Sequence, residues 1–458
     1  MASNKALIND LTEGPINRQI LTFSTPIILA NLLQVIYNMV DMVIVGQFCG
    51  SAGLSAVSVS SQVFTIMTVF CIGFATSGQI YISQLVGARR TEGLRAAIGT
   101  LFTFTLLIGI FMTVIGFTLC NPVLRLLNTP DEAFAQARAY TLICSGGMIF
   151  AYGYNVVAAI LRGMGDSRHP LMFIGLAAGL NLVLDLIFVG PMGLGVAGAA
   201  WATIIGQTIS LLLSLVYLYR RRVQFGFDFK RSSFRISGSV LKIYIKLGLP
   251  FAIKSCAINI SMIAVTGMVN AYGIVPSAAF GVGMKVQTIT IQIMLSVASA
   301  ISTMTGQNIG AGKFDRARRC VWAGIGFGWV LYAVFALIFL ICPVFVYRIF
   351  TPDEAVLALA PLFLHTLIIS FPAMATLEPI NGLVQASGSS VYFLVLALTD
   401  AIFFRIGLSY LFGTVLQMGI AGFFLGFSLA PYSTMIPNLI FFLSNCWKKR
   451  RLIHHEEA

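Results

Sequence analysis

The sequence predicts an all-α polytopic membrane protein with twelve transmembrane helices in two six-helix lobes. Hydrophobic residues make up 58% of the 458-residue chain and charged residues only 10%, whereas soluble domains average roughly 45–50% and about 25%. The apolar residues form twelve long runs, and the second half of the chain repeats the first. Composition, run length and repetition together give this fold class.

Each apolar run has about 20 residues or more, the length that a helix needs to cross a hydrocarbon core of roughly 30 Å. Strands of a membrane barrel would instead alternate apolar and polar residues over about ten positions. We expect helices near 20–46, 54–81, 96–120, 137–161, 170–190, 196–219, 242–270, 277–306, 320–346, 356–384, 391–413 and 418–446.

The repeat is read from short identical stretches at one separation. TPDEA occurs at Thr129 and again at Thr351, and other matches lie 222 to 224 positions apart. They pair Gln84, Gly87, Ala88, Gly165 and Pro26 with Gln307, Gly310, Ala311, Gly388 and Pro250. Six helices per copy is an even number, so both copies enter the membrane with the same polarity. This predicts a parallel repeat, a pseudo-two-fold axis along the membrane normal, and a substrate path between the lobes.

Two motifs favour structural roles. In TPDEA, we expect the threonine to cap a helix N-terminus, with proline in the first turn and the two acids opposing the positive end of the helix dipole. GLGVAG, from Gly193, fits a nucleotide-binding pattern but follows no expected strand, and its counterpart MGIAGF lies 224 residues later. We interpret it as a duplicated packing turn.

The net charge of +13 comes from basic residues placed on one side of the membrane. Of the 29 lysines and arginines, 23 fall in the N-terminal segment, the expected cytoplasmic loops and the C-terminal tail. The positive-inside rule then predicts cytoplasmic termini in a multi-pass protein of the cell membrane, with both TPDEA loops outside. The expected organisation is an amino-terminal lobe 1–219, a basic cytoplasmic linker 220–241, a carboxyl-terminal lobe 242–446 and a basic tail 447–458.

Several function classes lack a motif. No P-loop or HExxH is present, and the eight cysteines are scattered singly rather than in CxxC pairs. We therefore expect no metal, no cofactor, no catalytic residue and no nucleic-acid partner. The polar N-terminus also lacks the apolar core and cleavage site of a signal peptide.

Ionisable side chains inside the apolar runs are the first functional candidates, because a charge in lipid costs a few kcal/mol or more. Aligning the two copies with an offset of 224 places Val265 opposite Asp41 and Ser409 opposite Asp185. A residue needed for the scaffold should recur in both copies, so these acids point to a site in one lobe. The embedded ionisable residues are Asp41, Asp185, Lys254, Lys285, Glu378, Asp400 and Arg405, of which Lys254, Lys285, Asp400 and Arg405 have no assigned role.

Two polar neighbours extend the same site. Asn181 lies one helical turn from Asp185, and Thr203 lies near the outer end of the next helix. With a rise of about 1.5 Å per residue, Asp41, Asn181, Asp185 and Thr203 all reach the outer half of the membrane. The sequence therefore predicts a cation-binding or proton-binding pocket in the first lobe. In the second copy, Arg405 replaces Asn181 and Phe427 replaces Thr203.

These residues resemble a known family. YNMVDMVIVG from Tyr37, NLVLD from Asn181, GLGVAGAAWAT and LRGMGDS are similar to the multidrug and toxic compound extrusion (MATE) transporters, and most similar to the DNA-damage-inducible (DinF-like) branch. The resemblance implies a cation site of Asp41, Asn181, Asp185 and Thr203, supported by Tyr37, Asn38 and Glu378, with Pro26 as a helix hinge. Other branches of the family carry an acid where the expected helix 242–270 has Lys254, so the resemblance implies no sodium site in the second lobe.

The resulting functional prediction is a secondary antiporter that exports small, amphipathic, cationic organic compounds by alternating access, as a monomer surrounded by membrane lipid. H⁺ or Na⁺ is the coupling ion, because two close acids titrate as a coupled pair and can take up a proton outside and release it inside. The alternatives are a flippase for a lipid-linked glycan, which would need basic residues along its cavity, and a membrane enzyme, for which no nucleophile and base are evident.

Overall fold

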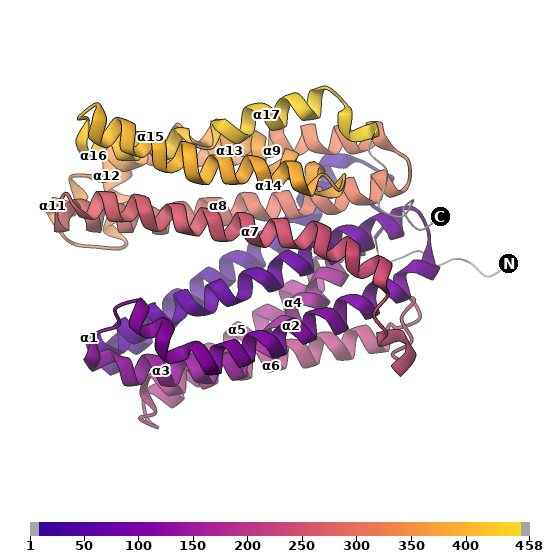
Figure 1. Cartoon of the computed structure of the whole chain (residues 1–458), viewed down its shortest axis with the longest axis horizontal. Helices are drawn as coiled ribbons and strands as arrows, with labels where there is room; N and C mark the ends of the chain where they lie inside the picture. The colour runs from indigo at the N-terminus through magenta and orange to yellow at the C-terminus, as the bar shows by residue number, and fades with distance from the viewer. Residues whose placement is uncertain (1–8, 450–458) are drawn as a thin grey trace. The chain divides into compact units, whose positions relative to one another are not determined.

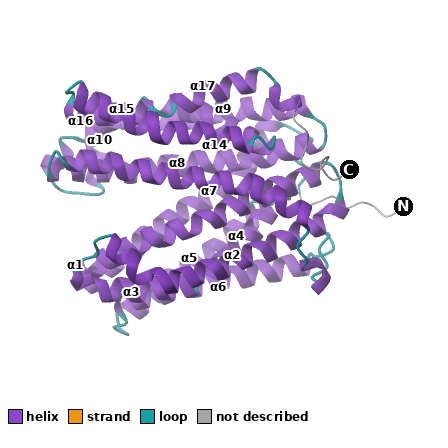
Figure 2. Ribbon diagram, in the orientation of Figure 1, coloured by secondary structure: helices purple, strands orange, loops and turns teal. Residues whose placement is uncertain are grey.

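The computed structural model describes residues 9–449, and all the regular secondary structure among them is helical (Figure 2). The expected all-α class is confirmed. The predicted basic tail, 447–458, lies mostly outside the described residues.

The helices of the first repeat correspond to the six expected spans (Figure 1). The first two spans run on as α1, but Gly50 interrupts the helix with φ 67° and ψ −163°. The fourth span is the pair α3 and α4, bent by 48°. The elements are α1 (Ile16–Gly87), α2 (Thr91–Leu126), α3 (Asp131–Gly146), α4 (Met148–Gly163), α5 (Arg168–Val189), α6 (Gly195–Arg220) and the short η1 (Arg231–Phe234).

The second repeat is more broken. Its fourth span is bent by 47° between α12 and α13, and its fifth contains two π-helical stretches, η2 and η3. The elements are α7 (Gly238–Asn270), α8 (Ile274–Gly310), α9 (Phe314–Ile341), α10 (Pro343–Arg348), α11 (Glu354–Leu357), α12 (Ala360–Ile368), α13 (Phe371–Ala386), α14 (Ser390–Thr399), η2 (Asp400–Ile406), α15 (Gly407–Tyr410), η3 (Leu411–Val415), α16 (Gly419–Leu429), α17 (Tyr432–Leu443) and η4 (Cys446–Lys449).

The number of spans agrees with the expectation. Among residues 9–449, nine helices are long and apolar enough to cross a membrane, and the two bent pairs bring the number to eleven. The break at Gly50 divides α1 into segments 16–49 and 51–87, each longer than the roughly 20 residues that a span requires. Twelve spans result.

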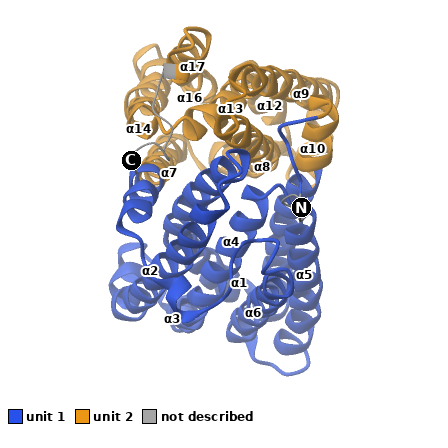
Figure 3. Cartoon of the chain, turned by 90° about the vertical axis from the view of Figure 1, so that its right-hand side faces the viewer, with its two compact units in different colours: residues 1–13, 25–249, 457 blue, residues 14–24, 250–456, 458 orange. Residues whose placement is uncertain are grey.

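The chain divides into two compact units (Figure 3). Among the described residues, unit 1 contains 9–13 and 25–249, and unit 2 contains 14–24 and 250–449. The divisions at 24/25 and 249/250 fall inside helices, α1 and α7, next to the repeat-related Pro26 and Pro250. Each unit has its own apolar core.

Close helix packing in each unit depends on glycine. In unit 1, a Cβ on Gly198 would come within 2.9 Å of Phe188, and in unit 2 a Cβ on Gly422 would collide with the backbone of Phe412. Gly193, in the turn before α6, adopts positive φ, as do Gly195 and Gly419, the first residues of α6 and α16. The interpretation of GLGVAG and its counterpart as a duplicated packing turn is therefore confirmed.

The capping prediction for TPDEA is wrong for the threonines. Thr129 donates its hydroxyl to the Leu124 carbonyl at 2.7 Å, because the end of α2 leaves that carbonyl without a helical partner. In the second copy Asp353 caps α11 by accepting from the Ala355 N–H at 2.9 Å, and Thr351 accepts from the Asp353 N–H. Asp131 and Glu132 lie in the first turn of α3, and Glu354 lies in that of α11, as expected. The prolines were expected in the first turns, but Pro130 is the N-cap residue of α3 and Pro352 precedes the N-cap of α11.

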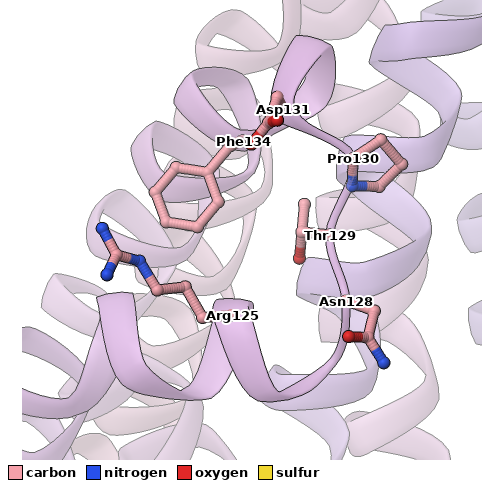
Figure 4. Close-up of a pocket in the computed structure, with 6 residues that line it drawn as sticks. All are labelled: Arg125, Asn128, Thr129, Pro130, Asp131 and Phe134. Carbon is pink, nitrogen blue, oxygen red and sulfur yellow. The ribbon is translucent and has the colours of Figure 1, made fainter.

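The first TPDEA turn forms a surface pocket between the end of α2 and the start of α3 (Figure 4). The residues that line it are Arg125, Asn128, Thr129, Pro130, Asp131 and Phe134, and none of them belongs to the predicted cation site.

Candidate functional site

Three helices of unit 1 bring the predicted cation-site residues together. α5 contributes Asn181 and Asp185, one turn apart, and α6 contributes Thr203. With its amide oriented to suit its neighbours, Asn181 donates to Asp185 Oδ2 at 3.3 Å and accepts from the Thr203 backbone N–H at 3.2 Å. Asp41, on α1, lies close enough to Asp185 for the two charges to interact. The four residues thus form one cluster.

Both carboxyl groups are buried without a counter-charge. Asp41 is 7% exposed and Asp185 is 1% exposed. One oxygen of each, Oδ1, has no hydrogen-bond partner among the described residues, and no described lysine, arginine or histidine forms an ion pair with either acid. An isolated buried carboxylate is costly, so this cluster strongly favours a bound proton or a bound cation.

Two side chains of α3 complete the cluster and were missed in the sequence. Tyr140 lies near Thr203, and Cys144 lies near Tyr140. Both interact electrostatically with Asp41. Aligned at the offset of the TPDEA pair, Tyr140 corresponds to Leu362 and Cys144 to Thr366. The comparison of copies, extended from ionisable residues to hydroxyl groups, would have found Tyr140.

Of the residues predicted to support the site, Tyr37 joins the cluster, whereas Asn38, Glu378 and Pro26 lie elsewhere. Tyr37 interacts electrostatically with Asp41 and Asp185, so it belongs to the cluster. Asn38 is exposed, and the structure gives it no contact with the acids. Glu378 lies on α13 of unit 2, where it accepts from Asn381 Nδ2 at 3.4 Å. Pro26 is buried in α1 at the division between the units.

The start of α5 is held by a buried acid that the sequence did not single out. Asp166, 3% exposed, accepts from the backbone N–H groups of Arg168 and His169 through Oδ1. Its Oδ2 lies 2.6 Å from His169 Nδ1 and accepts from the Tyr217 hydroxyl of α6 at 3.1 Å. Asp166 therefore joins α5 to α6 at the end opposite the Asn181 to Asp185 turn, which fixes the helix that carries the site.

Unit 2 has charges of both signs. Asp400 and Arg405 form a buried ion pair of 2.8 Å between Oδ2 and Nη2. Lys254 Nζ lies 4.2 Å from the centre of the Phe393 ring, within electrostatic reach of Glu378, Asp400 and Arg405. Lys285 is exposed on α8.

Comparison with known proteins identifies the family. A family model described as MatE matches residues 26–187 and 250–411, two stretches of equal length whose starts lie 224 positions apart. That separation is the offset of the internal repeat, and together the stretches cover more than half of the chain.

Similar proteins agree over almost the whole length. The chain is 28% identical over 443 residues to the probable multidrug resistance protein YoeA of Bacillus subtilis (strain 168), with 95% of each chain covered. It is 28% identical over 444 residues to YpnP of the same organism, covering 97% of this chain and 98% of the relative.

A solved structure described as the outward-facing conformation of a multidrug resistance MATE family transporter of the MOP superfamily has the same fold. Its TM-score is 0.90 at 24% identity, and 95% of this chain and 97% of that chain are covered. With the family model matching both repeats, the chain belongs to the MATE family of multidrug-efflux antiporters and is a multi-pass membrane transporter, not an enzyme.

Proposed function

We propose that the unit 1 cluster of Asp41, Asn181, Asp185 and Thr203 couples the export of organic cations to the entry of H⁺ or Na⁺. The observation that carries this proposal is the pair of buried acids with no described counter-charge. A proton or a sodium ion bound there supplies the missing charge, and an ion shifts a conformational equilibrium only if it binds one state more tightly than the other. Exposure of the cluster to alternate sides of the membrane then provides that difference.

The neighbouring side chains have distinct roles in this proposal. Asn181 orients Asp185 by donating to its Oδ2 and links it to α6 by accepting from the Thr203 N–H. Tyr37 and Tyr140 add hydroxyl groups on the side of Asp41. A proton needs only one carboxyl oxygen, whereas Na⁺ would use several of these oxygens together, so transport measurements under separate gradients distinguish the two ions.

Small, amphipathic, cationic compounds are the proposed substrates. Two relatives at 28% identity are described as probable multidrug resistance proteins. The two acids of unit 1 favour a cation over an anion near the cluster. A flippase for a lipid-linked glycan would need a basic surface instead. The fully buried charged side chains described in unit 1 are acidic, and the partly buried Arg162 donates to Gln79.

The proposed architecture places both termini and the linker 220–241 in the cytoplasm and both TPDEA loops outside, with lobes 1–219 and 242–446. The clustering of basic residues supports this orientation. Pro26 is the proposed hinge of α1, because proline removes a backbone hydrogen bond from the helix where the division between units falls. We propose a monomer as the functional unit, because one chain supplies both six-helix repeats.

The test replaces each acid with its amide. Asp41→Asn or Asp185→Asn should abolish dye export driven by an imposed proton or sodium gradient in proteoliposomes, because an amide keeps the shape but carries no charge. Expression and thermal stability should hold or rise, since the change removes an uncompensated buried charge. The exposed Glu132→Gln on α3 is the matched control and should transport normally.

Glu378→Gln decides between the units. If Glu378→Gln stops export while both aspartate variants still transport, coupling belongs to unit 2 and the proposal is wrong. If only a sodium gradient drives export, the antiport proposal stands and Na⁺ is the coupling ion.

A further inference from the structure

Unit 2 contains the counterpart of the proposed cation site, filled by an arginine. At the repeat offset of 224, Asn181 corresponds to Arg405, Asp185 to Ser409 and Thr203 to Phe427. In unit 1, position 181 contacts position 203 through the backbone N–H. In unit 2, the guanidinium carbon of Arg405 lies 5.4 Å from the centre of the Phe427 ring. The same two positions therefore meet in both units.

The rest of the counterpart is apolar. Val265, which corresponds to Asp41, is fully buried in the core of unit 2. Met262, which corresponds to Asn38, places its Sδ 3.9 Å from Arg405 Nη1. Arg405 itself is 7% exposed, and its Nε has no described hydrogen-bond partner. A permanent cation thus occupies the place where unit 1 has two acids and an amide.

Asp400 neutralises this cation because the helix is locally a π-helix. In an α-helix, side chains five positions apart point about 140° away from each other, since each residue advances about 100°. The π-helical stretch η2, Asp400–Ile406, closes its turns with i to i+5 hydrogen bonds. This brings Asp400 and Arg405 to one face, where they pair at 2.8 Å. Ser433 Oγ lies 3.4 Å from Asp400 Oδ1 and is the donor in that contact.

The two units therefore differ in their charge balance. The described buried charged side chains of unit 2 are Glu378, Asp400 and Arg405, and the partly buried Lys254 interacts most with Glu378 and next with Asp400. Their four charges sum to zero. In unit 1, the partly buried Arg162 donates to Gln79 and pairs with neither Asp41 nor Asp185, so both acids remain uncompensated among the described residues. Only unit 1 needs an ion from outside.

We propose that Arg405 is a tethered cation that takes the place of the exchangeable ion in unit 2, so that Asp400 is a latent site for H⁺ or Na⁺ that opens when the guanidinium is removed. The inference rests on the proposed function in one respect, the identity of the unit 1 cluster with which unit 2 is compared. In this proposal, the difference in ion binding between unit 1 and unit 2 is due to Arg405. Lys254 forms no ion pair with Asp400 among the described residues and interacts more strongly with Glu378, so we do not assign it this role.

The experiment measures bound ions in purified full-length protein. The starting protein, called the background variant, carries both Asp41→Asn and Asp185→Asn. Binding of radioactive Na⁺ at alkaline pH and proton uptake on acidification are both recorded in it. Adding Arg405→Gln should raise the bound cation from none to about one per chain, because one negative charge is left unbalanced. Adding Asp400→Asn to that variant should return it to none. Arg405→Lys, which keeps the charge, is the matched control and should bind none.

Thermal unfolding of the same variants covers the case in which Arg405→Gln folds poorly. Na⁺ or acid should stabilise Arg405→Gln, with choline as the ionic-strength control, and should stabilise Arg405→Gln with Asp400→Asn much less, because a bound ion stabilises only the state that binds it. Equal ion counts with and without Arg405→Gln, or a loss of folding that neither Na⁺ nor acid reverses, would overturn the proposal. If the background variant still binds as many ions as the wild type, the assignment of the unit 1 cluster is wrong. The change in bound ions that Arg405→Gln causes still tests the proposal for unit 2.

Discussion

Gly50 shows how one residue shapes the first two spans. Its φ of 67° and ψ of −163° belong to a backbone region that is essentially restricted to glycine. A Cβ added there would meet no atom within 4 Å, so only the backbone conformation, and not packing, excludes other residues.

We expect Gly50→Ala to lower the free energy of unfolding by about 1–3 kcal/mol. Thermal unfolding in detergent measures this change. Gly267→Ala on α7 is the matched control, because a Cβ at Gly267 also meets nothing within 4 Å but its φ is not positive. An equal loss of stability in both variants would show that the Gly50 conformation carries no special cost.

At the scale of elements, the segment between the repeats, residues 221–237, packs against α2. Phe225 and Phe227 are buried, and Thr103 of α2 donates to the Phe234 carbonyl at 2.7 Å. Arg95 of α2 donates to Ser233 Oγ at 2.8 Å and pairs with Asp228 at 3.4 Å. A Cβ on Gly99 would collide with the Ser233 carbonyl oxygen, so the close approach requires glycine on α2.

The docking of this segment should depend on pH. A hydrogen bond from Ser233, a backbone N–H and the charge of Arg95 hold the pKa of Asp228 below its ordinary value of 3.8. Ionised Asp228 therefore stabilises docking above that ordinary value, and the contribution disappears as the pH falls through the depressed pKa. Asp228→Asn should raise hydrogen exchange in residues 221–237 several-fold at neutral pH. The difference from wild type should vanish in acid, and a difference that is independent of pH would contradict the assignment to the carboxylate.

At the scale of the whole molecule, duplication supplied one scaffold with two different polar interiors. The family model matches the two copies over equal lengths, yet Asp41 and Asp185 occur in one and Arg405 in the other. Each copy keeps its glycine turn before the sixth span, because the helices must approach closely there. The polar residues changed independently of the scaffold.

The orientation of the molecule is tested by labelling. In a variant without the exposed Cys342 and Cys446, Glu132→Cys and Glu354→Cys should react with an impermeant thiol reagent added outside intact cells, since both TPDEA loops are expected there. Arg231→Cys in the linker should react only after the membrane is opened. Reaction of the linker cysteine alone in intact cells would reverse the topology.

The sequence by itself determined the helices, their number and the location of the charge-bearing residues. A helix that spans the membrane must carry about 20 apolar residues, so the twelve runs were visible without any contact between them. An acid inside such a run is costly wherever the helix packs, which made Asp41 and Asp185 stand out. Comparing the two copies then distinguished residues that recur, as a scaffold requires, from acids that occur in one copy. The span prediction and the site prediction both use only the local sequence and the repeat.

Only the tertiary structure decided which side chains meet. Tyr140 joins the cluster because α3 packs beside Thr203 of α6, and no periodicity encodes that neighbour. Thr129 bonds to Leu124 instead of capping α3, because its backbone N–H already binds the Leu124 carbonyl at the end of the preceding helix and brings the hydroxyl to the same oxygen. Asp400 meets Arg405 because a π-helical stretch changes the helical phase. In each case the partner depends on packing or on a local change of helix type, and a pattern based on regular α-helices contains neither.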